Sequence, residues 1–264
     1  MCHSNEASWK ITLGGFYSDS KSSIEAQHAA IDKSFRLSFE DDLNLEERLG
    51  TPFLLLNYDI NAKHSVYIDW KNLNRKSSIG TVGKDFSFSF NDGETYSVSA
   101  DSLIETKFNV DVYRIGYGYN IIKNENWQTT LLAGLHVMGF DLSLSGEISL
   151  CVDGICDYST YGARKEVVTQ VTAPLPNFGF YTEYTVNEDW RLLAKVQYFS
   201  IKLSDIQGSL LDFSTGFEYQ LIEKLTAKLT YEYYDIDVDY QKLPKRFNVR
   251  YGFKGPSLAI TYIF

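Results

Sequence analysis

The sequence predicts an all-β fold, a closed antiparallel transmembrane β-barrel of ten strands, with eight and twelve strands as alternatives. The first observation behind this prediction is the alternation of apolar and polar residues, expected of strands that face lipid on one side and a lumen on the other. Trp190 and Leu192 share one face of such a segment, whereas Arg191 and Lys195 share the other. The two segments that follow repeat the pattern, and each carries aromatic residues near its ends.

The second observation is that short and long connections alternate along the chain. Short polar turns are expected at 61–63, 123–125, 187–189 and 222–223. Longer links are expected at 18–50, 77–105 and 149–171, with shorter ones near 203–207 and 240–250. Membrane barrels sort their connections into short periplasmic turns and long extracellular loops, whereas a soluble sandwich has no reason to do so. The ten strands are placed near 8–17, 51–60, 64–76, 106–120, 126–142, 172–186, 190–202, 208–220, 224–238 and 252–264.

Composition excludes some classes of protein. No apolar stretch approaches the ~18 residues that a membrane-spanning helix needs. The formal net charge of -9 and the lack of a basic stripe argue against nucleic-acid binding. Tyr (19) and Phe (17) are abundant whereas Met (2) and Pro (5) are scarce, as in strand-rich chains. A soluble lipocalin-like barrel would share this composition, so the strand and loop pattern decides between them.

The first seven residues differ from the rest of the chain. They lack the apolar core of a secretory signal, and the alternating pattern begins only at Ser8 and Trp9. We therefore expect 1–7 to be a leader remnant or a disordered N-terminus, and 8–264 to form the barrel. We expect Cys2 to belong to this leader; the alternative is a lipidated N-terminal cysteine.

The two remaining cysteines, Cys151 and Cys156, flank an Asp153-Gly154 pair that can reverse the chain. The sequence therefore predicts a loop disulfide between them, which requires an oxidising compartment. The alternative is two free thiols. Four ligands with suitable spacing for a metal site are not available, so we expect neither a metal nor a cofactor.

Three patches of sequence resemble bacterial outer-membrane proteins. The final segment, 256–264, resembles their closing strand, which ends in aromatic residues that the barrel-assembly machinery recognises; Tyr262 and Phe264 would supply this signal here. The opening segment 9–17 is similar to the first strand of small OmpA- and OmpW-like barrels, and 37–45 looks like a loop of poorly characterised proteobacterial relatives. The resemblance implies a bacterial outer-membrane location, with lipid, lipopolysaccharide and the assembly machinery as partners. It brings no catalytic residue.

Two segments depart from the simple pattern. In the strand 106–120, the apolar residues Phe108, Val110 and Val112 are out of phase with Tyr113 and Ile115. A β-bulge near Val112 would bring both sets to the lipid side. Within the first long link, 31–39 looks strand-like, and the stretch from Glu40 to Glu47 could fold inward as a plug or gate.

If the apolar faces contact lipid, the opposite faces line the lumen and carry acids and bases in mixed order. These side chains are Asp59, Asp69, Lys71, Lys107, Asp111, His136, Glu183, Arg191, Lys195, Glu218, Lys228 and Glu232. A ten-stranded barrel has a narrow interior, and unpaired charges in it would be costly. The charges therefore either pair into a network that fills the lumen or line a narrow water-filled path.

Trp9, Trp127 and Trp190 all lie at the proposed periplasmic ends of strands. This placement is typical of an interfacial aromatic girdle, because indole rings prefer the boundary between lipid and water.

The leading functional hypothesis is a non-catalytic barrel, either a narrow porin-like channel or a structural or surface-interaction protein. An outer-membrane lipid-modifying enzyme or protease is the first alternative. Its base would be His28, which has Asp19, Glu25 and Asp32 nearby in sequence, since His136 is better explained by packing in the lumen. A soluble lipocalin-like binding barrel is the second alternative.

Overall fold

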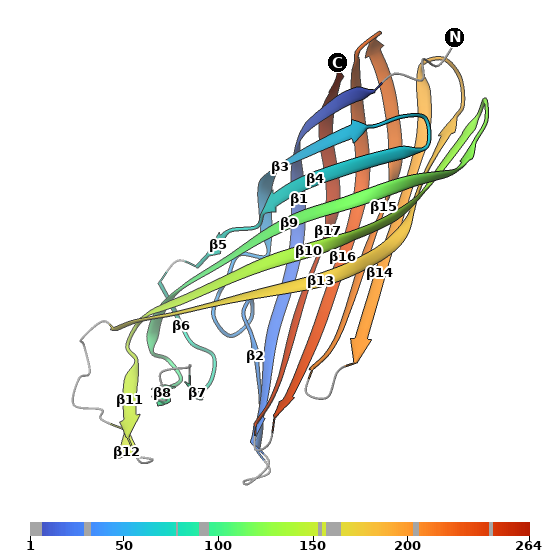
Figure 1. Ribbon diagram of the computed structural model, residues 1–264. Coiled ribbons are helices and arrows are strands. Elements are labelled where there is room, and N and C mark those ends of the chain that lie inside the picture. Colours follow the sequence, from blue (N-terminus) through green and yellow to red (C-terminus); the bar gives the residue numbers. More distant parts are fainter. Residues whose placement is uncertain are drawn as a thin grey trace.

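A computed structural model describes residues 7–28, 33–77, 79–89, 95–152, 155–156, 165–202, 206–242 and 245–264. Ten long strands form a closed antiparallel barrel (Figure 1), which confirms the predicted fold. They are β1 (Ser8–His28), β3 (Arg48–Asp59), β4 (His64–Asn72), β9 (Leu103–Lys123), β10 (Trp127–Gly146), β13 (Lys165–Thr185), β14 (Trp190–Lys202), β15 (Ile206–Ile222), β16 (Leu225–Lys242) and β17 (Lys245–Ile263). β17 pairs with β1, so the sheet closes on itself. Among the described residues, no helix has the length and apolar character needed to cross a membrane.

The tight turns lie at the end of the barrel where β1 begins and β17 ends (Figure 1). Three of them are closed by an asparagine side chain that accepts backbone N–H groups further along the chain. Asn61 accepts from His64, Asn124 from Trp127 and Asn187 from Trp190, at 2.8–3.0 Å. Asparagine favours such turns because its short side chain mimics a backbone carbonyl. This end is the periplasmic one, by the rule that short turns face the periplasm.

The longer connections carry short strands of their own. β2 (Lys33–Ser38) pairs with β1, beside the place where β3 leaves it, and corresponds to the strand-like segment predicted at 31–39. β5 (Arg75–Lys76) and β6 (Gly80–Thr81) pair with β9. A separate small sheet contains β7 (Phe86–Ser89), β8 (Thr95–Val98), β11 (Ser149–Val152) and β12 (Ile155–Cys156).

The wall reverses its polarity along the strands. In the half of the barrel near the tight turns, outward side chains such as Tyr231 and Tyr233 of β16 are apolar and exposed. Further along the same strand, Asp235 faces outward, whereas Tyr234 and Ile236 face inward and are buried. The same change occurs on the other long strands. The first half therefore suits lipid outside, and the second half suits water outside with an apolar interior.

This reversal overturns the predicted β-bulge near Val112. β9 runs straight through this region, with Val112 opposite Met138 and Val110 opposite Phe140 in unbroken register. The single register shift of this ladder lies at Thr129/Thr130, near the periplasmic turn. Phe108, Val110 and Val112 face the interior and not lipid, so the sequence prediction for them is wrong. This part of β9 lies in water, where the apolar face of a strand must point inward.

The extracellular half consists of two layers that diverge (Figure 1). β13 pairs with β14 only from Phe178 to Thr185, and its earlier residues pair with β10 alone. One layer contains β9, β10 and β13, and the other contains β14 to β17 with β1. Pro174 and Pro176 stand on the stretch of β13 that pairs with β10 but not with β14. Proline lacks an N–H donor, and it is tolerated on such an edge, where it discourages pairing with another chain.

An apolar core packs between the two layers. The Phe108 ring of β9 lies 5.8 Å from the Tyr251 ring of β17, and the Tyr234 hydroxyl donates to the Met138 sulfur at 3.4 Å. The first long link contributes the buried side chains Leu37, Phe39, Leu43 and Leu45 to this core. Leu43 and Leu45 thus place part of the predicted inward stretch between Glu40 and Glu47 in this core.

The reversal of polarity predicts opposite effects for neighbouring residues of β9. Replacing the fully buried Val110 by Asn should lower the free energy of unfolding by roughly 3 kcal/mol, because it buries an amide without partners. Lys107→Asn, on the outward face of the same strand, should change it by less than about 0.5 kcal/mol. Urea unfolding in detergent, followed by tryptophan fluorescence, measures both. Equal effects would contradict the inward placement of Val110.

Candidate functional site

The membrane half of the barrel encloses a polar cavity of about 250 Å³. The predicted lumen residues that line it are Asp59, Asp69, Lys71, Glu183, Arg191, Lys195, Glu218, Lys228 and Glu232. His136 is also inward and fully buried, with its ring 6.0 Å from that of Tyr234. Lys107 and Asp111 are not in the lumen, and their predicted placement there is wrong.

Both misplaced residues face outward on β9, beyond the lipid-facing part of the strand. Asp111 accepts hydrogen bonds from the Trp70 indole (3.4 Å) and the Asn72 amide (2.6 Å) on the neighbouring strand. Lys107 lies 3.9 Å from Glu105. The error follows from the bulge assumed near Val112, which reversed the two faces of this part of β9.

Buried ion pairs occupy the centre of the lumen, both between neighbouring strands and between opposite walls. Arg114 of β9 contacts Asp69 of β4 through its Nε atom at 2.6 Å, and it also pairs with Asp212 of β15. Asp212 accepts a second ion pair from Lys195 at 2.9 Å. Sequence reasoning did not place Arg114 and Asp212 in the lumen. The signal that could have found them is their alternation with apolar neighbours, Tyr113 and Ile115 for Arg114 and Leu211 and Phe213 for Asp212.

A second layer of ion pairs lies nearer the periplasm. Lys10 pairs with Asp59 at 2.9 Å, and Glu218 pairs with both Arg191 (2.7 Å) and Lys228 (3.0 Å). The basic side chains of the lumen are Lys10, Lys71, Arg114, Arg191, Lys195 and Lys228. They are matched by as many acids, Asp59, Asp69, Glu183, Asp212, Glu218 and Glu232. The formal charges therefore cancel, and each of these cations has an acidic partner.

Lys71 marks the upper boundary of the charged lumen. Its ammonium pairs with Glu232 and lies 5.5 and 5.6 Å from the ring centres of Phe53 and Phe16. Above this level the interior is the apolar core described above. Burial there raises the pKa of Tyr251 to about 12. The charged lumen is thus closed at its extracellular end by packed aromatic and aliphatic side chains.

Arg75 fixes the inward loop to this core. Its side chain is fully buried, and its two terminal nitrogens donate to Glu40 (2.6 Å) and to the Ser22 hydroxyl (2.7 Å). The guanidinium also lies over the rings of Phe108 and Tyr251, at 5.6 and 5.4 Å. A buried charge needs this degree of pairing. Sequence reasoning missed Arg75, because a single arginine in a polar loop carries no signal of burial.

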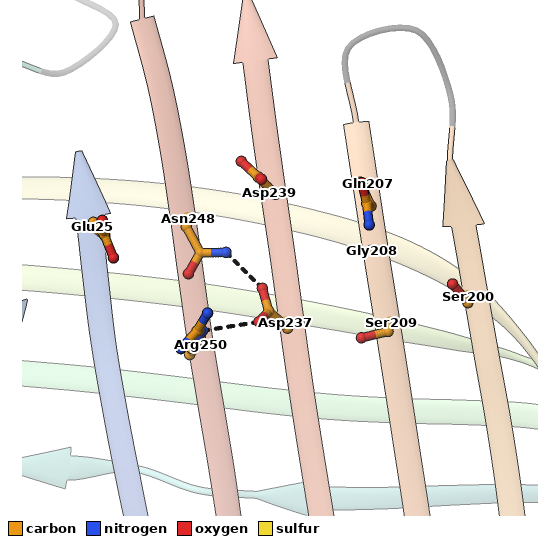
Figure 2. A pocket seen from close by; sticks show the side chains of 9 residues that line it. All are labelled: Glu25, Ser200, Gln207, Gly208, Ser209, Asp237, Asp239, Asn248 and Arg250. Atoms are coloured by element: carbon orange, nitrogen blue, oxygen red, sulfur yellow. Dashed lines mark hydrogen bonds and ion pairs between the residues drawn. The ribbon is translucent and has the colours of Figure 1, made fainter. Parts of the chain in front are cut away.

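The outer wall of the extracellular half carries a polar hollow of about 350 Å³ (Figure 2). Five adjacent strands, β1 and β14 to β17, contribute to it. Its lining residues are Glu25, Ser200, Gln207, Gly208, Ser209, Asp237, Asp239, Asn248 and Arg250. Asp237 accepts hydrogen bonds from Asn248 (2.6 Å) and Arg250 (2.9 Å), which holds the centre of the hollow in place. The arrangement offers hydroxyl, amide and carboxylate groups on a rigid sheet.

The predicted girdle tryptophans are all exposed near the periplasmic turns. Trp9, Trp127 and Trp190 each lie beside a tyrosine ring of the next strand, at centroid distances of 4.6–4.8 Å. At the end of β17, the exposed rings of Tyr262 and Phe264 pack edge to face at 4.8 Å. These rings form an aromatic band around the rim, as expected at a membrane interface.

Other predicted residues fall partly or wholly outside the described part of the chain. Cys151 and Cys156 are directly opposite one another on β11 and β12, but their side chains lie outside the described residues. The same is true of the His28 side chain and of Asp32. Among the described residues, no group of histidine, cysteine and carboxylate side chains has the arrangement of a metal site.

Comparisons with known proteins support the fold and nothing finer. No protein-family model matches the chain, and no curated protein matches it in sequence. The crystal structure of the outer-membrane protease OmpT from Escherichia coli is similar over 97% of each chain, with a TM-score of 0.60 and 10% identity. Ail from Yersinia pestis is less similar, with a TM-score of 0.37 and 11% identity over 98% of this chain and 99% of Ail. The toluene transporter TodX from Pseudomonas putida has a TM-score of 0.38 and 8% identity over 97% of this chain and 90% of TodX. The chain is an outer-membrane β-barrel by fold.

The central ion pairs predict a stability difference within the lumen. Arg114→Leu leaves Asp69 without its arginine partner in a buried site, and we expect a loss of roughly 3–5 kcal/mol in the free energy of unfolding. Lys10→Leu removes a half-exposed pair and should cost about 1 kcal/mol or less. Thermal unfolding of both variants in the same detergent compares them. If Arg114→Leu costs no more than Lys10→Leu, the network does not stabilise the barrel.

Proposed function

We propose that this protein is a non-conducting, non-catalytic barrel of the bacterial outer membrane that presents its extracellular layers for interaction at the cell surface. The observation that carries the proposal is the closed extracellular half. A pore needs a continuous hydrated path, and here packed side chains from both layers and from the link at 37–45 fill the interior.

The charges of the lumen support the same proposal. A selective pore carries an excess of charges of one sign, or charges without partners, along its path. Here the acids and bases of the lumen are equal in number, and each base pairs with an acid, as in the cluster of Arg114, Asp69 and Asp212. Such a network neutralises the lumen and narrows the space for a solute to a cavity of about 250 Å³.

The polar hollow of Figure 2 is the surface best suited to a partner. It faces outward on the extracellular half, and its neutral donors and acceptors include Gln207, Ser209 and Asn248. Such side chains match the hydroxyl groups of a carbohydrate, which both donate and accept hydrogen bonds. A surface glycan is therefore the partner that we propose for this hollow.

The similarity to OmpT does not extend the proposal to proteolysis, because at 10% identity it concerns the fold. Of the described histidine side chains, His136 is fully buried beside Tyr234, and His64 lies next to a periplasmic turn in contact with Tyr117. Neither stands on the extracellular surface, where an external substrate would arrive.

Planar-bilayer recording tests whether the extracellular half of the barrel is closed to ions. Refolded protein that is shown to be inserted should give no discrete conductance steps, whereas a general porin reconstituted in the same way should. Reproducible steps that change with Lys195→Ala would overturn the proposal and identify the lumen as a pore.

A glycan array probed with labelled proteoliposomes tests the hollow. We expect a defined set of glycans to bind the wild type, and a double variant, Gln207→Ala with Asn248→Ala, to bind at least about tenfold more weakly, since it loses two hydrogen-bonding groups. Asn109→Ala, at an outward polar position of β9 in the other layer, is the matched control. Equal binding by wild type and double variant would show that the hollow is not the partner site.

A further inference from the structure

The β13 strand has a free edge over much of its length in the extracellular half. Its residues from 165 to 177 pair with β10 on one side, but its pairing with β14 begins only at Phe178. Figure 1 shows β13 and β14 diverging beyond that point. The backbone groups on that side of β13 therefore have no strand partner among the residues that the structure describes.

The direction of these backbone groups follows from two hydrogen bonds at the periplasmic end of β13. Thr185 donates its N–H to the Asn126 carbonyl at 2.8 Å, toward β10, whereas Val186 donates to the Trp190 carbonyl at 2.9 Å, toward β14. N–H directions alternate along a strand, and the ladder between β13 and β10 has no register shift. Odd-numbered residues of β13 therefore bond to β10. Beyond Phe178, the even-numbered residues direct their N–H and C=O groups to the open side.

Prolines protect only the part of this edge that lies next to β14. Pro174 and Pro176 are even-numbered, so the N–H groups that they lack would have faced the open side, and the ladder with β10 loses no bond. From 167 to 173 the strand carries no charged residue and is rich in valine and threonine, which favour β-structure. The even-numbered residues of this stretch that keep both outward backbone groups are Glu166, Val168, Gln170 and Thr172.

The protein covers comparable strand edges elsewhere with its own chain. On the other side of the same layer, β5 and β6 pair with β9, and the Leu73 and Val110 backbones bond one another at 2.8 and 3.3 Å. β1 pairs with β3 only up to Asp19, and it pairs with β2 from Ser23 onward. An uncovered edge is a template for pairing with another strand. In the described part of the chain, the long edge left for such a partner is that of β13.

We propose that this edge pairs with the same edge of a second copy of the protein, as an antiparallel pair of β13 strands centred on Thr169. A two-fold axis brings identical surfaces together, so both strands present their even-numbered residues to one another. In this register Val168 exchanges backbone hydrogen bonds with Gln170 of the second copy, and Glu166 does so with Thr172 of the second copy.

This register uses the whole open stretch of the edge. Lys165 lies opposite Ala173 of the second copy, so the paired segment ends just before Pro174, which has no N–H to donate. The charges of the segment, Lys165 and Glu166, lie at one end and stand opposite uncharged residues, so no like charges meet. The pairing joins β9, β10 and β13 of both copies into one sheet. It does not use the hollow of Figure 2, which lies on the other layer, and it is independent of glycan binding.

Disulfide cross-linking of the detergent-purified protein tests the register. On the two-fold axis, the two copies of residue 169 form a non-hydrogen-bonded pair with Cα atoms about 4.5 Å apart, which a disulfide can span. Thr169→Cys should therefore give a covalent dimer on a non-reducing gel after mild oxidation. Ala173→Cys is the matched control, because it shares this face of the strand but its two copies would lie roughly 25 Å apart. Equal dimer yields from the two variants, which share the native cysteines, would overturn the proposal.

Val168→Pro tests the pairing without an added cysteine. It removes an N–H that faces the open edge and leaves the bonds to β10 intact, as Pro174 and Pro176 do. Sedimentation in detergent should show at least about tenfold weaker dimerisation, since each copy loses one backbone bond to the other. Val168→Thr keeps the N–H and should dimerise as the wild type does. Heat-dependent gel migration confirms that each variant is folded. A wild type that stays monomeric, or a proline variant that dimerises equally well, would refute the pairing.

Discussion

The structure depends on one constraint: every long strand of the wall passes from lipid into water, so the solvent on its outer face changes along its length. In lipid, the outward side chains must be apolar, and the inward ones are free to be charged if they pair. In water, the outward side chains must be polar, and the interior gains stability by becoming apolar. β16 shows both rules on one strand, with Tyr233 outward below the change and Asp235 outward above it. The paired lumen and the dry core are therefore two consequences of the same requirement.

The pairing of strands around the barrel also changes at the boundary between lipid and water. Where lipid surrounds the wall, each barrel strand has a partner on both sides, because an unpaired backbone group in hydrocarbon has no water to satisfy it. Above that level β13 leaves β14 at Phe178, and the two layers diverge. Water can satisfy the freed backbone groups there, and Pro174 and Pro176 reduce their number. The separation makes room for Phe39 and Leu43 of the first link to enter between the layers, and Arg75 holds that link in place.

Much of this could be predicted from the sequence, because strand period and loop length are local properties. The ten strands, the tight turns and the exposed tryptophans are all local signals. The face of Phe108, Val110 and Val112 was predicted wrongly, since alternation shows that two faces differ but not which solvent lies outside. The pairing of Arg114 with Asp212 could not be predicted either, because the two residues are 98 positions apart and meet only across a closed barrel. Burial of Arg75 likewise depends on three distant segments meeting around it.

The charges of the lumen have a role that apolar side chains could not fill. Burying ion pairs is rarely the most stabilising way to occupy a space. A slip of one strand by one residue against its neighbours, however, would turn its inward side chains outward and its outward side chains inward. Such a slip of β9 or β14 would transfer Arg114 or Lys195 into hydrocarbon, where a charge is very costly. A slip by two residues keeps the faces but draws an outward acid such as Asp235 toward the lipid. Lumen charges and outer-wall acids together therefore oppose slips of the strands in register and in depth within the membrane.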